Sequence, residues 1–355
     1  MLFAVAACEL AARVVFPAPP NPTRQPQIVY QFDPGIRYVL LPNQRGWIDD
    51  GFVTTNSLGF RGRELVSPKP RGQFRMVAIG DSLTFGWGVN DNDTFCAQLE
   101  QLLRRRFPAS DVDVVNLGVG GYDTHQEVAL LKRNVARLQP DMVLVGFYSN
   151  DVPEAFDDQE TAQAAETGDV SPTGRILHLN PAPLSFFDAQ MRRSRAIFAV
   201  GRVVKRLSHT GEWARSGFSM ELDLLKGQDS AELNIAWDRI TRHLAELRKM
   251  ATAGHFAVGI VALPPREQVM GVYGNAHYQT RLRAIAEQFG FLVIDPLPAL
   301  AARASDADAL FIPYDRNHPS AAGHRVLANA IFDSLEQHDA VKPTAQRVAG
   351  QGSEW

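Results

Sequence analysis

Residues 74–84 read Phe-Arg-Met-Val-Ala-Ile-Gly-Asp-Ser-Leu-Thr, and they set the interpretation of the whole chain. The run from Met76 to Ile79 is apolar without polar alternation, which is typical of a buried parallel strand. Gly80 lets the backbone turn sharply, and Ser82 follows two residues later. Ligands of open α/β sheets bind at the carboxyl ends of strands, so Ser82 lies where a nucleophile would be useful. The alternative is a strand-to-helix turn in which Ser82 only caps the helix.

The composition is that of a globular protein. The chain has 355 residues, of which 45% are hydrophobic and 21% charged, and its formal net charge is −3. This length suits one large domain with additions. The sequence pI of about 6.3 and the dispersed basic residues argue against a nucleic-acid partner. Two cysteines provide no disulfide framework, and the nine histidines are scattered without metal-ligand spacing. We therefore expect neither a metal nor a cofactor.

Apolar runs and amphipathic stretches alternate through the main part of the chain. After the first strand, further strands are predicted at residues 112–117, 142–148, 257–263 and 291–294. The predicted helices cover residues 94–107, 124–138, 231–253, 275–289 and 320–337. Strands that alternate with helices form a parallel sheet with helices on both faces. The sequence therefore predicts an α/β fold of three layers, α/β/α, around a five-stranded parallel sheet.

Four regions are expected along the chain. Residues 1–22 are apolar and then proline-rich, which indicates an N-terminal anchor or signal remnant and association with a membrane. Their apolar part is short for a membrane-spanning helix. Residues 23–72 contain strand-like pieces and turn residues, and predict a small β appendage and linker. The main domain covers residues 73–337, and a loose tail is expected over residues 338–355.

Residues 152–230 form a long insertion in the main domain. They separate the third strand from its helix by far more than the usual few residues. The first part is acidic, and a later part carries six basic residues among apolar ones, namely Arg192, Arg193, Arg195, Arg202, Lys205 and Arg206. A basic amphipathic helix of this kind could lie on an anionic membrane. We favour the other interpretation, a lid over the sheet with a solvated basic face.

Polar side chains follow the predicted carboxyl ends of the strands. Ser82 follows the first strand, and residues 149–151, Ser-Asn-Asp, follow the third. Asp315 and His318 stand three residues apart before the last helix. A serine nucleophile needs a base to accept its proton, and the base needs an acceptor on its other ring nitrogen. We therefore predict that Ser82, His318 and Asp315 form a catalytic triad.

Acyl transfer also requires hydrogen-bond donors for the oxyanion that develops on the substrate. The candidates are the backbone N–H groups of Ser82 and Gly118 and the side-chain amide of Asn150. A glycine after the second strand lets a substrate approach the main chain closely. Considered alone, Asn150 could equally be a turn residue that bonds its own backbone.

Four sequence blocks resemble those of the SGNH (GDSL-type) hydrolases. They are Gly80-Asp81-Ser82-Leu83-Thr84, Asn116-Leu117-Gly118, Ser149-Asn150-Asp151 and Asp315-Arg316-Asn317-His318, in the family's order and spacing. The resemblance covers residues 74–335 and implies a flavodoxin-like topology. It implies Ser82 as nucleophile, His318 as base and Asp315 as the acid that orients it. It also implies that Ser82, Gly118 and Asn150 form the oxyanion hole.

One position departs from the family's pattern. The third block usually reads Gly-x-Asn-Asp, whereas here Tyr148 holds the place of the glycine. Tyr148 joins Asp81 and His125 as the candidate substrate contacts. His324 falls inside the last predicted helix and is expected to be structural. The N-terminal residues are similar to those of membrane-associated bacterial members, which implies a location in the cell envelope; a cytoplasmic location is the alternative.

Two other kinds of site are disfavoured by the motifs. The nucleophile elbow of α/β-hydrolases, G-x-S-x-G, is absent around Ser82. The loop after the second strand lacks the last glycine of the dinucleotide motif, because residue 123 is Asp. We therefore expect a serine esterase that cleaves acyl esters, O-acetyl or other short-chain ones, through an acyl-serine intermediate. Its expected substrate is a small molecule or a carbohydrate of the cell envelope.

Two alternatives to hydrolysis stay open. The first is an O-acetyltransferase that passes the acyl group to an envelope polysaccharide. The second is a non-catalytic carbohydrate-binding module that retains the fold.

Overall fold

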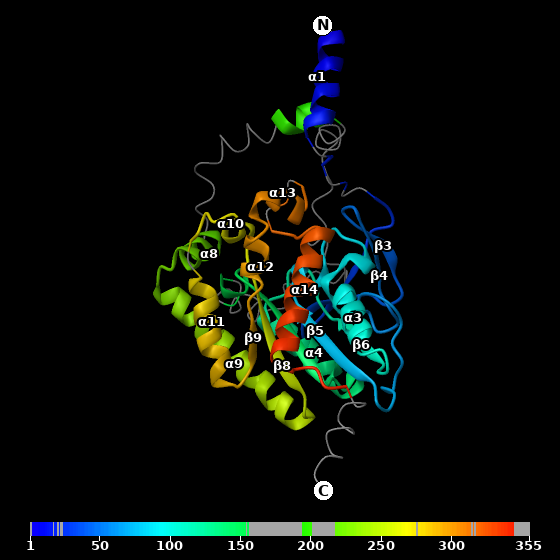
Figure 1. The fold of residues 1–355 in the computed structure, drawn as a ribbon, viewed down its shortest axis with the longest axis vertical. Coiled ribbons are helices and arrows are strands. Elements are labelled where there is room, and N and C mark those ends of the chain that lie inside the picture. Colours follow the sequence, from blue (N-terminus) through cyan, green and yellow to red (C-terminus); the bar gives the residue numbers. More distant parts are fainter. Residues whose placement is uncertain are drawn as a thin grey trace.

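Figure 1 shows the fold in a computed structural model of the chain. The structure describes residues 2–343 except residues 17, 20, 22, 23, 154, 156–193, 201–216, 275, 314 and 316. Its centre is a five-stranded parallel sheet, ordered β6–β5–β7–β8–β9. The strands are β5 (Phe74–Gly80), β6 (Val112–Asn116), β7 (Met142–Tyr148), β8 (Ala257–Leu263) and β9 (Leu292–Ile294). Numbered along the chain, this order is 2-1-3-4-5, so the predicted flavodoxin-like α/β fold is confirmed.

Helices cover both faces of the sheet (Figure 1). The long ones are α3 (Phe95–Arg106), α4 (Thr124–Leu138), α9 (Ala231–Gly254), α11 (His277–Gln288) and α14 (Ala321–Gln337). Alternate side chains of β5 enter two separate cores. Val77 and Ile79 pack in the core that includes α4, α9 and α11, and Met76 and Ala78 pack in the core that includes α3 and α14. Both faces of β5 are buried, which explains why its sequence shows no polar alternation.

Short helices connect the main elements. They are α2 (Ser82–Phe85), α8 (Gly217–Lys226), α10 (Arg266–Val269), α12 (Leu297–Ala301) and α13 (Ala307–Leu310), with the 3-10 turns η1 (Asp91–Asp93) and η2 (Ala304–Asp306). The predicted long helices and strands are observed, with ends that differ by up to two residues. For example, the helix predicted from residue 94 begins at Phe95, because Thr94 is its N-cap and accepts a hydrogen bond from the N–H of Ala97.

The residues before the sheet form two β hairpins. The first pairs β1 (Tyr30–Asp33) with β2 (Arg37–Leu40), and the second pairs β3 (Arg45–Ile48) with β4 (Gly51–Thr54). In the first hairpin, the hydroxyl of Tyr38 lies 3.0 Å from the carbonyl oxygen of Gly120 and 2.8 Å from that of Gly121. The second hairpin contacts the loop after α2. Both hairpins are therefore attached to loops at the carboxyl end of the sheet.

The N-terminal helix α1 (Leu2–Val15) projects away from the sheet (Figure 1). Glu9 accepts hydrogen bonds from the hydroxyl of Ser194 and the N–H of Ala196, at the start of a helical segment over residues 195–200. No helix in the described part of the chain is long and apolar enough to cross a membrane. The predicted acidic part of the insertion, most of its basic stretch and the tail after residue 343 lie outside the described residues.

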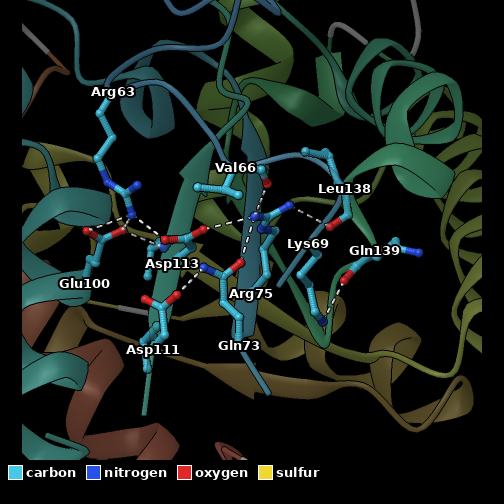
Figure 2. A network of polar contacts seen from close by, with 12 residues as sticks. Arg63, Val66, Lys69, Gln73, Arg75, Glu100, Asp111, Asp113, Leu138 and Gln139 are labelled. Carbon is cyan, nitrogen blue, oxygen red and sulfur yellow. Dashed lines mark hydrogen bonds and ion pairs between the residues drawn. The ribbon is translucent and has the colours of Figure 1, made fainter. Parts of the chain in front are cut away.

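A network of charged groups fastens the linker to the amino end of the sheet (Figure 2). Arg75 on β5 is buried, and its guanidinium donates to the carbonyl oxygens of Val66 and Leu138 at 2.9 and 3.2 Å. It also forms an ion pair with Asp113 on β6 at 3.1 Å, and Arg63 pairs with the other oxygen of that carboxylate. These contacts lie at the opposite end of β5 from Ser82. They hold the hairpins and the sheet together without taking part in the chemistry.

Arg61 is expected to be essential for stability. It is 4% exposed and donates to the carbonyl oxygens of Phe85, Gly86 and Val89, at 2.8, 2.6 and 2.6 Å. Changing Arg61 to Met would leave these carbonyls without their charged donor, so the free energy of unfolding should fall by roughly 3–5 kcal/mol. Urea denaturation measures this loss.

The matched control is Arg106→Met, because the side chains of Arg106 and its partner Glu336 are 50% and 31% exposed. Ion pairs of exposed side chains contribute only about 0–1 kcal/mol. An equal loss of stability in both variants would contradict the role assigned to Arg61.

Candidate active site

Ser82 is the first residue of α2, which starts directly after β5. The N-cap of α2 is Asp81, whose carboxylate accepts a hydrogen bond from the N–H of Leu83 at 2.8 Å. Capping is thus performed by the neighbouring residue, and the hydroxyl of Ser82 does not serve this purpose. The side chain of Ser82 is half-buried at the carboxyl edge of the sheet.

Two glycines on adjacent strands make room for α2. Gly80 ends β5 and pairs in register with Gly146 of β7. A Cβ atom on either glycine would overlap the hydroxyl of Thr84, which is completely buried between them. The missing side chains therefore allow the helix that carries Ser82 to lie directly on the strand ends.

The structure brings Ser82, His318 and Asp315 together. The hydroxyl of Ser82 lies 2.9 Å from Nε2 of His318. Nδ1 of the same ring lies 2.8 Å from Oδ2 of Asp315. A carboxylate at Nδ1 keeps the proton on that nitrogen, so Nε2 is an acceptor for the proton of the serine. This arrangement can activate a serine nucleophile.

Asp315 is oriented by its own backbone neighbours. Its Oδ1 accepts hydrogen bonds from the N–H groups of Asn317 and His318 at 2.8 and 2.9 Å. Burial disfavours the charged carboxylate, but the hydrogen bonds and the charge of His318 outweigh it and hold the pKa of Asp315 below its usual value. The carboxylate is therefore ionised at neutral pH, with Oδ2 directed at the imidazole.

The structure corrects one of the predicted oxyanion donors. Gly118 is buried, and its N–H already donates to Oδ1 of Asn116 at 2.9 Å. A Cβ atom at Gly118 would overlap the backbone of Phe85, so this glycine is needed for packing against α2. The next glycines of the same loop, Gly120 and Gly121, have no hydrogen-bond partner for their N–H groups in the described part of the chain.

Asn150 lies beside Asp81, the residue that precedes Ser82. Its side chain is half-buried and hydrogen-bonded to the carboxyl group of Asp81. A primary amide carries two N–H donors, so this side chain can donate to more than one acceptor. The turn at residues 149–151 is also held by Glu221 of α8, which accepts a 2.6 Å hydrogen bond from the hydroxyl of Ser149. Glu221 lies in the insertion, and the sequence analysis did not single it out.

Comparison with known proteins agrees with this geometry. Residues 78–326 match the model of the GDSL-like lipase/acylhydrolase family. The chain belongs to this family. It is therefore an ester hydrolase, as the sequence blocks implied. No curated protein sequence matches the chain.

Several solved structures have a similar fold. One is an α/β-hydrolase enzyme from the metagenome of Lake Arreo, Spain, at 17% identity and a TM-score of 0.43, with 74% of this chain and 95% of that one covered. Another is a catalytic mutant of an acetylxylan esterase from Geobacillus stearothermophilus, at 17% identity and a TM-score of 0.42, with 74% and 94% covered. A third is a two-domain esterase active on acetylated mannans, at 16% identity and a TM-score of 0.43, with 76% of this chain and 50% of that chain covered.

Two buried carboxyl groups lie close to Ser82 of this acylhydrolase. Asp81 and Asp151 are both fully buried. Desolvation raises the pKa of Asp81 from its usual 3.8 to about 6, against hydrogen bonds that favour the charged form. Burial, together with the charge of Asp81, also holds the pKa of Asp151 well above its usual range. Ionisation of these two carboxyl groups as the pH rises therefore destabilises the folded protein.

Changing Asp81 to Asn is expected to stabilise the acylhydrolase at neutral pH. The folded protein keeps the proton of Asp81 up to about pH 6, whereas the unfolded chain loses it near pH 4. The stability that this proton provides is therefore present below pH 4 and lost by pH 7. Asparagine does not titrate, so the variant keeps this stability at both pH values. Relative to wild type, the variant should gain roughly 2–3 kcal/mol between pH 4 and pH 7. Urea denaturation at both pH values measures the gain, and equal pH dependence in variant and wild type would contradict it.

The candidate substrate contacts do not border the reacting atoms. Asp81 and Tyr148 are at most 1% exposed, so these two predicted contacts are wrong. His125 is exposed on α4, and the structure places its ring 5.0 Å from that of His243 on α9 rather than beside His318. His324 is structural, since it is fully buried and its Nδ1 accepts a hydrogen bond from the N–H of Phe95. Desolvation lowers the pKa of His324 to about 3, which keeps its ring neutral.

A tryptophan that the sequence analysis did not single out lies against His318. Trp87 stacks on His318 with 5.9 Å between ring centroids and 23° between ring planes. No cluster of three or more histidine, cysteine or acidic side chains in the described part of the chain could hold a metal ion.

Proposed function

We propose that this acylhydrolase is a serine esterase that works through an acyl-Ser82 intermediate. The observation that carries the proposal is the continuous hydrogen-bonded chain from Ser82 through His318 to Asp315. Ser82 Oγ attacks the ester carbonyl carbon while Nε2 of His318 accepts its proton. The imidazolium then protonates the departing alcohol, and water hydrolyses the acyl-serine with His318 again as base.

The oxyanion is stabilised by donors close to Ser82. We assign this role to the N–H of Ser82, the amide of Asn150 and a backbone N–H of the Gly120–Gly121 segment in place of Gly118. Gly120 lies against Trp87, which itself stacks on His318, so this segment borders the reacting groups. Such fixed donors stabilise the transition state because they need no reorientation during the reaction.

Changing Asn150 to Ala is expected to reduce kcat by about 10²–10³-fold, the usual cost of removing one oxyanion donor. The half-buried position of Asn150 means that the variant should still fold. Steady-state kinetics on p-nitrophenyl acetate measure the loss, and circular dichroism checks the fold. Asn134→Ala on α4 is the matched control, because the amide of Asn134 donates its hydrogen bond to the carbonyl of Leu130 in its own helix. Full activity of the Asn150 variant would contradict its assignment.

The proposed substrates are O-acetyl or other short-chain esters, on small molecules or on carbohydrate of the cell envelope. The side chains of His318 and Asp315 are 19% and 23% exposed, so an ester carried by a larger molecule can reach them. An envelope location is supported by α1, where Leu10 and Val14 are 67% and 83% exposed. Apolar side chains in such exposed positions favour association with a membrane.

The test combines a substrate series with detection of the intermediate. Hydrolysis of p-nitrophenyl esters of increasing chain length should be fastest for acetate, and rapid acid quenching should leave an acetyl group on the peptide that contains Ser82. A preference for long chains would reject the short-chain assignment. Adding acetylated and free sugars distinguishes an acetyltransferase, which would transfer the acetyl group to a sugar hydroxyl faster than to water. The absence of acyl-Ser82 under all conditions would reject the covalent mechanism.

A further inference from the structure

Trp87 is held from three sides by segments that are distant in sequence. One contact is the stack on His318 described above. A second is Gly120, where an added Cβ atom would come within 2.9 Å of the indole ring. The third is Asp49, whose Oδ2 accepts a hydrogen bond from the indole Nε1–H at 2.8 Å. The indole therefore connects the N-terminal hairpins to the catalytic base.

Asp49 has a well-defined position at the tip of the second hairpin. It occupies the two-residue turn between β3 and β4, with a left-handed φ of 50°. Gly51 lies directly against the backbone of Gly88 and Val89, where a Cβ atom would overlap main-chain atoms. The hairpin is further held by Asp91, whose Oδ2 accepts hydrogen bonds from the N–H and the hydroxyl of Thr54 at 3.0 and 2.6 Å. The hairpin tip is thus fixed along the loop that carries Trp87.

His318 needs a contact of the kind that Trp87 provides. Its ring is held by one partner at each nitrogen, Ser82 at Nε2 and Asp315 at Nδ1. Two bonds at opposite edges of a ring leave it able to tilt about the line that joins them. A planar group stacked on the ring face opposes this tilt, and general-base catalysis depends on such alignment.

We propose that Asp49 and Trp87 are positioning residues for His318. The second hairpin, β3–β4, then contributes to the active site through Asp49. Asp49 fixes the rotation of the indole, and the indole fixes the plane of the imidazole. The inference rests on the proposed role of His318 as the base.

The test compares variants of Asp49 with a matched variant of its neighbour. Asp49→Ala should lower kcat for p-nitrophenyl acetate about tenfold with little change in KM. A tenfold change in rate corresponds to the net free energy of roughly one hydrogen bond. Asp49→Asn should stay within about twofold of wild type, because its amide oxygen can still accept the indole N–H. Asp50→Ala should match wild type, since Asp50 is in the same turn but pairs with exposed Arg24 instead.

A double variant separates a positioning role from a structural one. Trp87→Phe keeps an aromatic ring but removes the N–H, and should lower kcat to a similar extent. Adding Asp49→Ala to Trp87→Phe should then cause no further loss, because the proposed effect of Asp49 on His318 is transmitted through that N–H. An unchanged kcat in Asp49→Ala, or a full additional loss in the double variant, would overturn the inference. If Ser82→Ala remained active, the proposed function itself would fail, and this outcome is distinct from both.

Discussion

Replacing Ser82 with alanine is expected to lower kcat by roughly 10⁵–10⁶-fold, as removal of the nucleophile does in serine hydrolases. The Ser82 hydroxyl is the group that becomes acylated in the proposed mechanism. The variant should fold normally, because Asp81 rather than Ser82 caps α2. Kinetics on p-nitrophenyl acetate and labelling with a fluorophosphonate probe, followed by peptide mapping, measure the effect.

Ser57→Ala is the control for this experiment. Ser57 is an exposed serine of the appendage, hydrogen-bonded to Glu64. The control should keep both activity and labelling. Labelling of a peptide other than the one with Ser82, or activity that survives in Ser82→Ala, would reject Ser82 as the nucleophile.

Changing Asp315 to Asn is expected to lower kcat by about 10⁴-fold through the tautomer of the imidazole. The N–H groups of Asn317 and His318 both donate to Oδ1 of Asp315. In the variant, the amide oxygen should keep these two bonds, which directs the –NH₂ group at Nδ1 of His318. Nδ1 must then accept, so the ring proton moves to Nε2 and blocks transfer from Ser82. Single-turnover kinetics should show slow acylation with an unchanged melting temperature.

Asp308→Asn makes the same chemical change nearby without touching the imidazole. The Asp308 side chain is 94% exposed and pairs with Arg266, so this variant should keep wild-type kcat. An Asp315→Asn enzyme with at least a tenth of wild-type kcat would contradict the tautomer argument.

Local sequence patterns were sufficient for the central sheet and its helices. The apolar runs at β5 and β7 have no polar alternation because both faces of each strand are buried, and this pattern depends only on the residues themselves. The proximity of Ser82, His318 and Asp315 was also predictable, because parallel strands carry their carboxyl ends to one edge and Asp315 is only one turn of chain from His318. The structure brings these three side chains together as predicted.

Predicted site contacts were wrong where a residue is hydrogen-bonded within its own loop or buried in the core. Gly118 was a reasonable oxyanion donor until Asn116, two residues earlier, was found to accept its N–H. Asp81 and Tyr148 lie next to functional residues in sequence, yet both face the interior. Neighbouring residues of a chain can point in opposite directions, and only packing decides which of them meets solvent.

The chain by itself determined which elements form and which reactive groups stand at their ends, because hydrophobic periodicity and capping act over a few residues. Only the tertiary structure decided how the N-terminal hairpins contribute to the site. The contact of Asp49 with Trp87, and that of Trp87 with His318, join segments that are 38 and more than 200 positions apart. Such contacts follow from how the completed sheet places its loops, and no local pattern in the sequence encodes them.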